Sequence, residues 1–135
     1  CDAVDGTRIA RAVRAVSIPV CGNGGITSFA ELERMRRESG ARFAMVGRGA
    51  LADPWIFSGR RVSRGEAARF LVEYADTLRA RRSWPAGTIA WRLKQLLRYW
   101  TAGGLVPDVT TRRGYLRERD GEALIARLRG LALEV

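Results

Sequence analysis

Residues 17–26 have the sequence Ser-Ile-Pro-Val-Cys-Gly-Asn-Gly-Gly-Ile, and this stretch decides the fold that we predict for the chain. The pattern is that of a short buried strand that runs directly into a glycine turn. The pattern returns further along the chain, where Phe-Ala-Met-Val at 43–46 is followed by Gly-Arg-Gly-Ala at 47–50. Each apolar segment therefore ends in a loop of small residues, and a helical pattern follows each loop.

Two such loops are typical of an anion-binding site. Glycines let backbone N–H groups approach a ligand closely, and a helix N-terminus adds partial positive charge. In a (β/α)8 barrel, the loops after the last two strands form a common phosphate site. We therefore predict that residues 23–25 and 47–49 bind a phosphate group. An ordinary strand-to-helix turn at 23–25 and a surface salt bridge at Arg48 are the alternatives.

The predicted fold class is α/β. Residues 1–60 are expected to form the C-terminal portion of a (β/α)8 TIM barrel, and residues 61–135 an all-α helical bundle. Crossovers of this length imply that the two strands pair in parallel. Two strand–helix units cannot close a barrel, and strands buried on both faces need neighbours. We therefore expect the chain to be the C-terminal part of a longer protein, and to aggregate if it is made alone.

The helices follow from apolar periodicity and capping signals. Ser28 and Glu31 predict a capping box before the second helix, and Gly40 predicts its end. Thr110 to Arg113 are expected to lie in a loop that begins before Pro107. The predicted helices span residues 5–16, 29–38, 65–82, 88–101 and 122–133.

The charge of the chain is strongly basic, with 24 basic and 14 acidic residues and a net charge of +10. Fifteen of the basic and eight of the acidic residues lie in 61–135. This excess favours an anionic partner, either nucleic acid or a membrane surface. Trp91 and Tyr99 could stack on unpaired bases, whereas Trp100 is expected in the helical core. Contacts to RNA phosphates are predicted, with a solvated helix face as the alternative, for Arg92, Lys94, Arg98, Arg112 and Arg113.

Several classes of site are excluded by composition. The chain has no histidine and only two cysteines, Cys1 and Cys21, so it cannot assemble a Cys/His metal site or a Ser-His-Asp triad. We predict no metal. Two cysteines do not make a disulfide framework, which favours a reducing, cytoplasmic location. No apolar run has transmembrane length, so no segment is expected to span a membrane. We also predict no membrane partner and a monomer.

Two motifs resemble the tRNA-dihydrouridine synthases. They are Ile-Pro-Val-x-x-Asn-Gly-x-Ile at 18–26 and Met-Val-Gly-Arg-Gly-Ala-Leu-x-x-Pro-Trp-Ile-Phe at 45–57. The helix pattern Arg-Leu-Lys-Gln-Leu-Leu-Arg-Tyr-Trp at 92–100 is similar to the tRNA-binding helical domain that follows the barrel in this family. The resemblance covers nearly the whole chain.

The resemblance implies an FMN-dependent enzyme that reduces selected tRNA uridines to 5,6-dihydrouridine and uses NADPH to recharge the flavin. It also implies a catalytic cysteine well upstream of these motifs, which neither Cys1 nor Cys21 matches, so no catalytic residue is expected in this chain. The family usually has an acidic residue at the position of Gly25. By resemblance, the FMN phosphate is held by Asn23, Gly24, Gly25, Gly47 and Arg48.

Two other functions stay open on the sequence alone. The barrel loops also permit a phosphate-binding TIM-barrel enzyme that acts on a small metabolite without flavin, because a fold does not dictate a function. The basic helices also permit a non-catalytic module that binds RNA without reacting.

Overall fold

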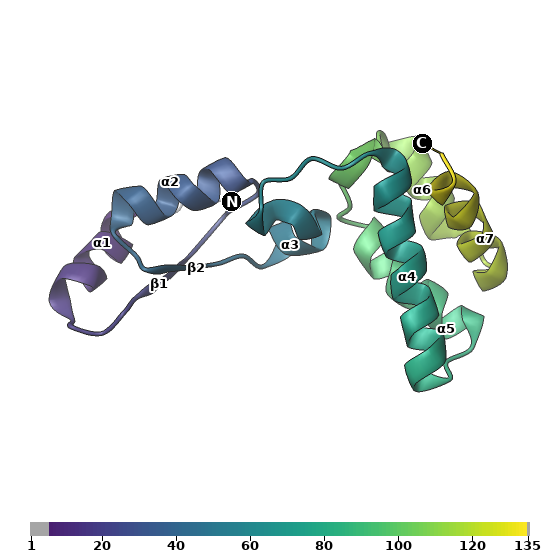
Figure 1. Ribbon diagram of the computed structural model, residues 1–135, viewed down its shortest axis with the longest axis horizontal. Helices are drawn as coiled ribbons and strands as arrows, with labels where there is room; N and C mark the ends of the chain where they lie inside the picture. The colour runs from purple at the N-terminus through teal and green to yellow at the C-terminus, as the bar shows by residue number, and fades with distance from the viewer. Residues whose placement is uncertain (1–5, 135) are drawn as a thin grey trace. The chain divides into compact units, whose positions relative to one another are not determined.

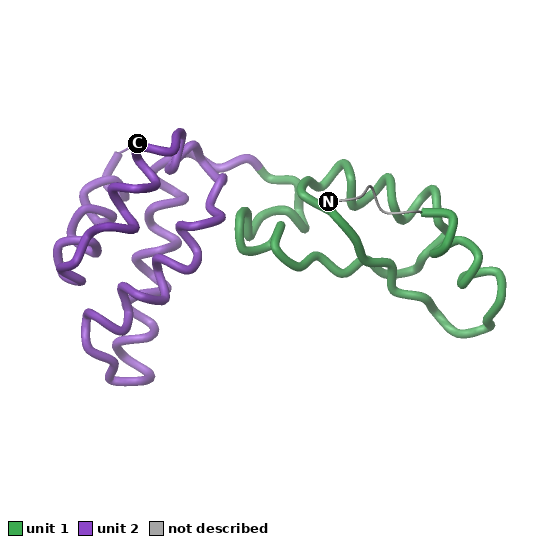
Figure 2. Tube along the Cα trace, turned by 180° about the vertical axis from the view of Figure 1, so that it is seen from behind, with its two compact units in different colours: residues 1–60 green, residues 61–135 purple. Residues whose placement is uncertain are grey.

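The computed structural model describes residues 6–134, which form two compact units, Cys1–Arg60 and Arg61–Val135 (Figure 2). Figure 1 shows their elements in chain order. The first unit contains α1 (Gly6–Ala15), β1 (Cys21–Asn23), α2 (Phe29–Ser39), β2 (Phe43–Met45), α3 (Arg48–Ala52) and the 3₁₀ helix η1 (Pro54–Phe57). The second contains α4 (Arg64–Arg82), α5 (Ala86–Leu97), the 3₁₀ turn η2 (Ala102–Gly104), α6 (Val109–Arg117) and α7 (Gly121–Ala132).

The two strands of the first unit pair in parallel, as predicted, and Gly22 lies opposite Ala44 in the register. These two residues face α2, which lies alongside both strands (Figure 1). A Cβ on Gly22 would lie 2.5 Å from the Met35 sulfur and 3.4 Å from Ile9 of α1. Glycine at position 22 thus lets α2 pack close to the strand, and an added Cβ would require the flexible end of the Met35 side chain to move.

The sheet is shorter and more exposed than predicted. The expected buried strand at 17–22 is wrong in two respects, because β1 begins only at Cys21 and Ile18 is 71% exposed. The late start follows from the register, because β2 begins at Phe43 and Phe43 lies opposite Cys21. Helix α2 covers one face of the sheet, while Phe43 and Met45 on the other face are 52% and 53% exposed, as expected for two such strands without neighbours.

Helix α2 begins and ends close to where the sequence predicts. The Ser28 hydroxyl accepts the Glu31 amide at 3.2 Å, which is half of the predicted capping box. The Glu31 carboxylate accepts the Thr27 amide and hydroxyl, each at 2.7 Å, one residue before its expected partner. Gly40 ends the helix in the left-handed conformation, with φ of 73°, as predicted.

The second unit has a closed apolar core between four helices. Trp100 is fully buried, as predicted, and its indole N–H donates to the Ala102 carbonyl at 3.1 Å. Phe70 of α4 packs beside it, with ring centroids 5.9 Å apart. The largest fully buried side chains are Trp100, Tyr115, Leu71, Ile89, Leu93, Leu97, Leu105, Leu124, Ile125 and Leu128.

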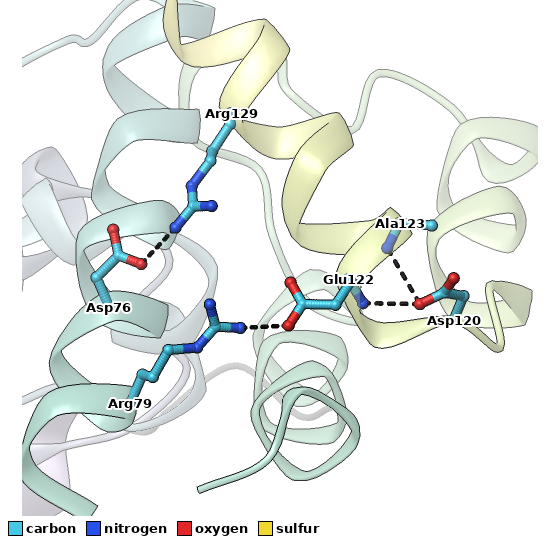
Figure 3. Close-up of polar contacts among 6 residues, drawn as sticks. All are labelled: Asp76, Arg79, Asp120, Glu122, Ala123 and Arg129. Atoms are coloured by element: carbon cyan, nitrogen blue, oxygen red, sulfur yellow. Dashed lines mark hydrogen bonds and ion pairs between the residues drawn. The ribbon is translucent and has the colours of Figure 1, made fainter. Parts of the chain in front are cut away.

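Two ion pairs join α4 to α7 on the surface of this unit (Figure 3). Arg129 contacts Asp76 at 2.7 Å, and Arg79 contacts Glu122 at 2.7 Å. The Asp120 side chain caps α7 by accepting the Glu122 amide at 2.9 Å and the Ala123 amide at 3.3 Å. The Arg79–Glu122 pair therefore lies at the capped start of α7, and the Arg129–Asp76 pair lies near the end of that helix.

The segment 110–113 is helical, which corrects the predicted loop. Asp108 starts α6, because its carboxylate accepts the Thr111 amide at 2.7 Å and the Thr111 hydroxyl at 3.1 Å. Helix α5 also differs from the predicted span, since it starts at Ala86 and ends at Leu97 rather than continuing to 101.

Candidate functional site

The two glycine loops leave the same edge of the sheet. Asn23 and Met45 are the last residues of parallel strands and lie opposite each other in the register. The loop that begins at Gly24 and the loop that contains Gly47 are therefore neighbours at the carboxyl edge. In open α/β sheets this edge is where ligands bind.

The loop backbones are exposed and conformationally unusual. Gly24 and Gly25 have φ of 147° and 58°, values that side-chain-bearing residues rarely adopt. A Cβ built on Gly47 would meet nothing within 4 Å, so the backbone there borders open space. Asn23, Gly25 and Gly47 are all exposed. The geometry leaves room for a ligand against the main chain of both loops.

Gly49 brings the two loops into direct contact, a role that the sequence analysis missed. A Cβ at this position would lie 2.4 Å from the carbonyl oxygen of Ile26, which belongs to the first loop. Ile26 also joins a small core with Leu32 and Ile56, against which Val46 packs. Each loop is thus anchored by an apolar residue while its glycines stay at the surface.

Arg48 is exposed and opens α3, next to Gly47. The first turn of α2 contributes less to an anion site than the sequence suggests. The Ser28 hydroxyl already accepts the Glu31 amide, and the Glu31 carboxylate places a negative charge at this helix start. The Thr27 hydroxyl and amide donate to that carboxylate and hold the pKa of Glu31 below its ordinary value. An anion at this edge would therefore depend on the glycine loops and Arg48.

The five basic residues singled out as RNA contacts in the second unit divide into two groups. Arg92, Arg98 and Arg113 are exposed. Lys94 and Arg112 are half-buried and have partners within the fold: the Lys94 ammonium donates to the Glu118 carbonyl, and Arg112 donates to the Trp100 carbonyl at 3.1 Å. These two cations donate to carbonyls of residues that follow the ends of α6 and α5. A contact with RNA would compete with these bonds.

No cysteine side chain is part of the glycine loops or of the set of basic residues in the second unit. Cys21 is exposed on the uncovered face of the sheet, and Cys1 lies outside the described residues. Within 6–134 there is no group of three or more His, Cys, Asp or Glu side chains arranged to hold a metal ion. No helix in the same range is both long and apolar enough to cross a membrane.

The family model described as dihydrouridine synthase matches residues 2–96, which is more than half of the chain. This chain belongs to the dihydrouridine synthase family. The match covers the described part of the first unit, including both glycine loops, and continues through α4 into α5.

The chain is similar to several curated proteins whose names contain the family name. It is 34% identical over 88 residues to a probable tRNA-dihydrouridine synthase of Rickettsia typhi, covering 65% of this chain and 23% of the relative. It is 46% identical over 48 residues to the tRNA-dihydrouridine(16) synthase of Cupriavidus necator, covering 36% and 15%. It is 43% identical over 64 residues to tRNA-dihydrouridine synthase B of Xanthomonas axonopodis pv. citri, covering 47% and 17%. The chain thus spans less than a quarter of the length of these curated relatives.

Proposed function

We propose that this chain supplies the FMN-phosphate loops and the RNA-holding helices of a tRNA-dihydrouridine synthase, which reduces uridines in tRNA to 5,6-dihydrouridine with NADPH as the reductant. The observation that carries the proposal is the adjacency of the two glycine loops at one sheet edge in a chain of this family. The first unit would be the end of a TIM barrel, and residues 61–135 the tRNA-binding domain.

The loops fit the phosphate end of FMN. Backbone approach to a phosphate needs positions without a Cβ, and Gly24, Gly25 and Gly47 provide them. Asn23 and Arg48 are exposed beside them, and a guanidinium offers paired donors to phosphate oxygens. The proposal assigns the phosphate to these five residues. Gly25 stands where an acidic side chain is usual in the family, so contact at this position is with the backbone.

In this proposal the residues of this chain bind and orient FMN and the tRNA, and none of them transfers a proton. FMN, when bound, supplies the hydride chemistry that uracil reduction requires. Asn23 to Gly25 and Gly47 to Arg48 fix one end of the cofactor, which limits its freedom relative to the RNA base. Cys21 does not act as the acid, because it lies on the strand before the loop.

The helical unit would hold the tRNA by shape and by backbone charge. Its exposed arginines Arg92, Arg98 and Arg113 are the residues to which the proposal assigns phosphate contacts. Lys94 and Arg112 support this surface from within by fixing the ends of α6 and α5. A target base would have to leave its stack to meet the flavin.

A comparison of FMN with riboflavin tests the cofactor assignment, because riboflavin lacks only the phosphate. Titration followed by flavin fluorescence is expected to show that the protein prefers FMN. Arg48→Gln should lower the affinity for FMN about tenfold and leave that for riboflavin unchanged, as expected for loss of a charged hydrogen bond. Arg42→Gln is the matched control, since Arg42 precedes β2 and lies at the opposite edge of the sheet.

The same proposal predicts a cellular phenotype. tRNA from cells that lack the gene should lose dihydrouridine at one or more positions, measured by mass spectrometry of its nucleosides. The wild-type gene should restore it, and an Arg48→Gln gene should restore less. Equal affinity for FMN and riboflavin, together with unchanged tRNA in the deletion strain, would refute the proposal.

A further inference from the structure

The turn between α4 and α5 lies at the lower end of the second unit in Figure 1. Aromatic and cationic side chains contact one another around this turn. The Arg92 guanidinium carbon lies 5.1 Å from the centroid of the Trp91 ring and 5.6 Å from that of Trp84. Arg82, at the end of α4, lies 6.0 Å from the Trp84 ring. These distances are within the range of cation–π contact. We call these four residues, Arg82, Trp84, Trp91 and Arg92, the turn cluster.

The turn is built to hold these side chains outward. Ser83 ends α4 in the left-handed conformation with φ of 52°, and it is the only described residue other than glycine with a positive φ. Pro85 then starts α5. Trp84 is half-buried against this turn, and Trp91, on the second turn of α5, leaves 55% of its surface exposed. The core of the unit uses other faces of α5, through Ile89 and Leu93.

We propose that the turn cluster is a stacking site for an unpaired nucleotide base of an RNA. Aromatic and guanidinium planes stack on bases that are not paired, and the adjacent cations meet the phosphates that flank such a base. The inference rests on the proposed function and adds to it a contact with single-stranded RNA, which helix-face arginines alone do not provide.

The positive charge of the turn cluster favours an RNA over a protein as its partner. Arg82 and Arg92 are both exposed, and within residues 61–134 neither forms an ion pair with an acidic side chain. A protein would need acidic side chains at the right places to complement the turn cluster. In RNA, every base is flanked by negatively charged phosphates. The unit carries an excess of seven positive charges, fifteen basic against eight acidic residues in 61–135. An RNA strand therefore complements both the rings and their surroundings.

The experiment measures the affinity of the protein for two RNAs of equal length, an oligo(U) strand and a fully paired duplex. Trp91→Leu should weaken oligo(U) binding about tenfold and leave duplex binding unchanged, since a base stack contributes in this range. Trp91→Phe should retain most of the oligo(U) affinity. Arg92→Gln should lower the salt dependence of oligo(U) binding by about 0.7 in the logarithmic slope.

Arg64→Gln is the control for charge, because Arg64 begins α4 and lies about 27 Å from Arg82 along the helix. It should leave the ratio of oligo(U) to duplex affinity unchanged. Leu133→Ser is the control for exposed apolar surface, since Leu133 is 84% exposed at the end of α7. Circular dichroism should show that each variant melts as the wild type does.

The outcomes separate this inference from the proposed function. If the wild type binds both RNAs and Trp91→Leu weakens neither, or both equally, the stacking site is overturned while the tRNA-binding proposal stands. If the wild type binds neither RNA, the stacking site is overturned, while the proposed function is still decided by the flavin titration and the tRNA of the deletion strain. Should Trp91→Leu abolish capture of an acidic protein and leave oligo(U) binding intact, the cluster is a protein-docking site and the inference is wrong.

Discussion

The two units of this chain differ in how they are stabilised. The helical unit encloses a core of ten large side chains that are almost completely buried, with Trp100 and Tyr115 the largest. The strand-containing unit has a small core around Ile26, Leu32 and Ile56. Its sheet leaves Phe43 and Met45 exposed on one face. The helical unit is therefore stabilised by a large buried core, whereas the strand-containing unit has a small core beside the sheet edge from which both glycine loops leave.

The two units also differ in how close the residues that stabilise the fold lie to the residues proposed to bind ligands. In the helical unit the candidate RNA contacts lie on a surface that the core supports. In the strand-containing unit the residues that pack the loops, such as Gly49 and Ile26, are immediate neighbours of the residues assigned to phosphate. A packing change should therefore alter binding strongly in the first unit and weakly in the second.

The largest expected effect comes from the helical core. Trp100→Ala should lower the free energy of unfolding of the second unit by about 3–5 kcal/mol, because it empties a fully buried site and removes the indole bond to Ala102. Urea denaturation followed by circular dichroism measures this. FMN affinity should not change. Trp91→Ala is the control, since this exposed tryptophan should change the unfolding free energy by about 0.5 kcal/mol or less.

Gly49→Ala should have the next largest effect, in the first unit. The added methyl would meet the Ile26 carbonyl oxygen, which costs about 1–3 kcal/mol of unfolding free energy and moves the two loops apart. FMN affinity should fall with it. Gly47→Ala is the control for the change in unfolding free energy. A Cβ at this position meets no atom within 4 Å, so the variant should be as stable as the wild type. If both alanine variants unfold at the same urea concentration as the wild type, the loops are not packed as described.

The surface ion pairs between α4 and α7 should contribute less (Figure 3). Arg79→Gln and Arg129→Gln should each lower the unfolding free energy by less than about 1 kcal/mol, because both pairs are solvent-exposed. The loss should shrink in about 1 M salt, which screens such pairs. A loss that is larger than this and independent of salt would show that these pairs, rather than the core, hold α7 in place.

The smallest expected effect is a pH dependence at the start of α6. The Thr111 amide, more than its hydroxyl, holds the pKa of Asp108 below the ordinary value of 3.8. A group whose pKa is lower in the folded state stabilises the protein above its unfolded pKa, and that stabilisation disappears as the pH falls through the folded pKa. Thermal melts below about pH 5 should therefore show less acid sensitivity for Asp108→Asn, which keeps an oxygen acceptor at the cap but cannot ionise.

Local signals in the sequence predicted the local structure. Ser28 and Gly40 mark the ends of α2, and the apolar pattern around Trp100 identifies the helical core. These features depend on residues that are near one another in the chain. The parallel pairing of β1 and β2 was also predictable, because a helical crossover of this length permits no hairpin.

Features that depend on distant residues were not predictable in the same way. Lys94 and Arg112 bond to carbonyls 24 and 12 residues away, which no spacing rule indicates. The contact between Gly49 and Ile26 requires the register of the sheet. Helix α6 was missed although Asp108 and Thr111 have the spacing of an N-cap and its partner, because Pro107 and the threonines favoured a loop.

The central claim is that the two glycine loops together hold one phosphate. Nuclear magnetic resonance of the ¹⁵N-labelled protein tests it most directly, with inorganic phosphate and FMN as the two ligands. The account predicts that the amide signals of Gly24, Gly25 and Gly47 shift with both ligands and saturate together, and that Arg48→Gln weakens both titrations. Shifts confined to one loop, or to residues away from the carboxyl edge of the sheet, would contradict it.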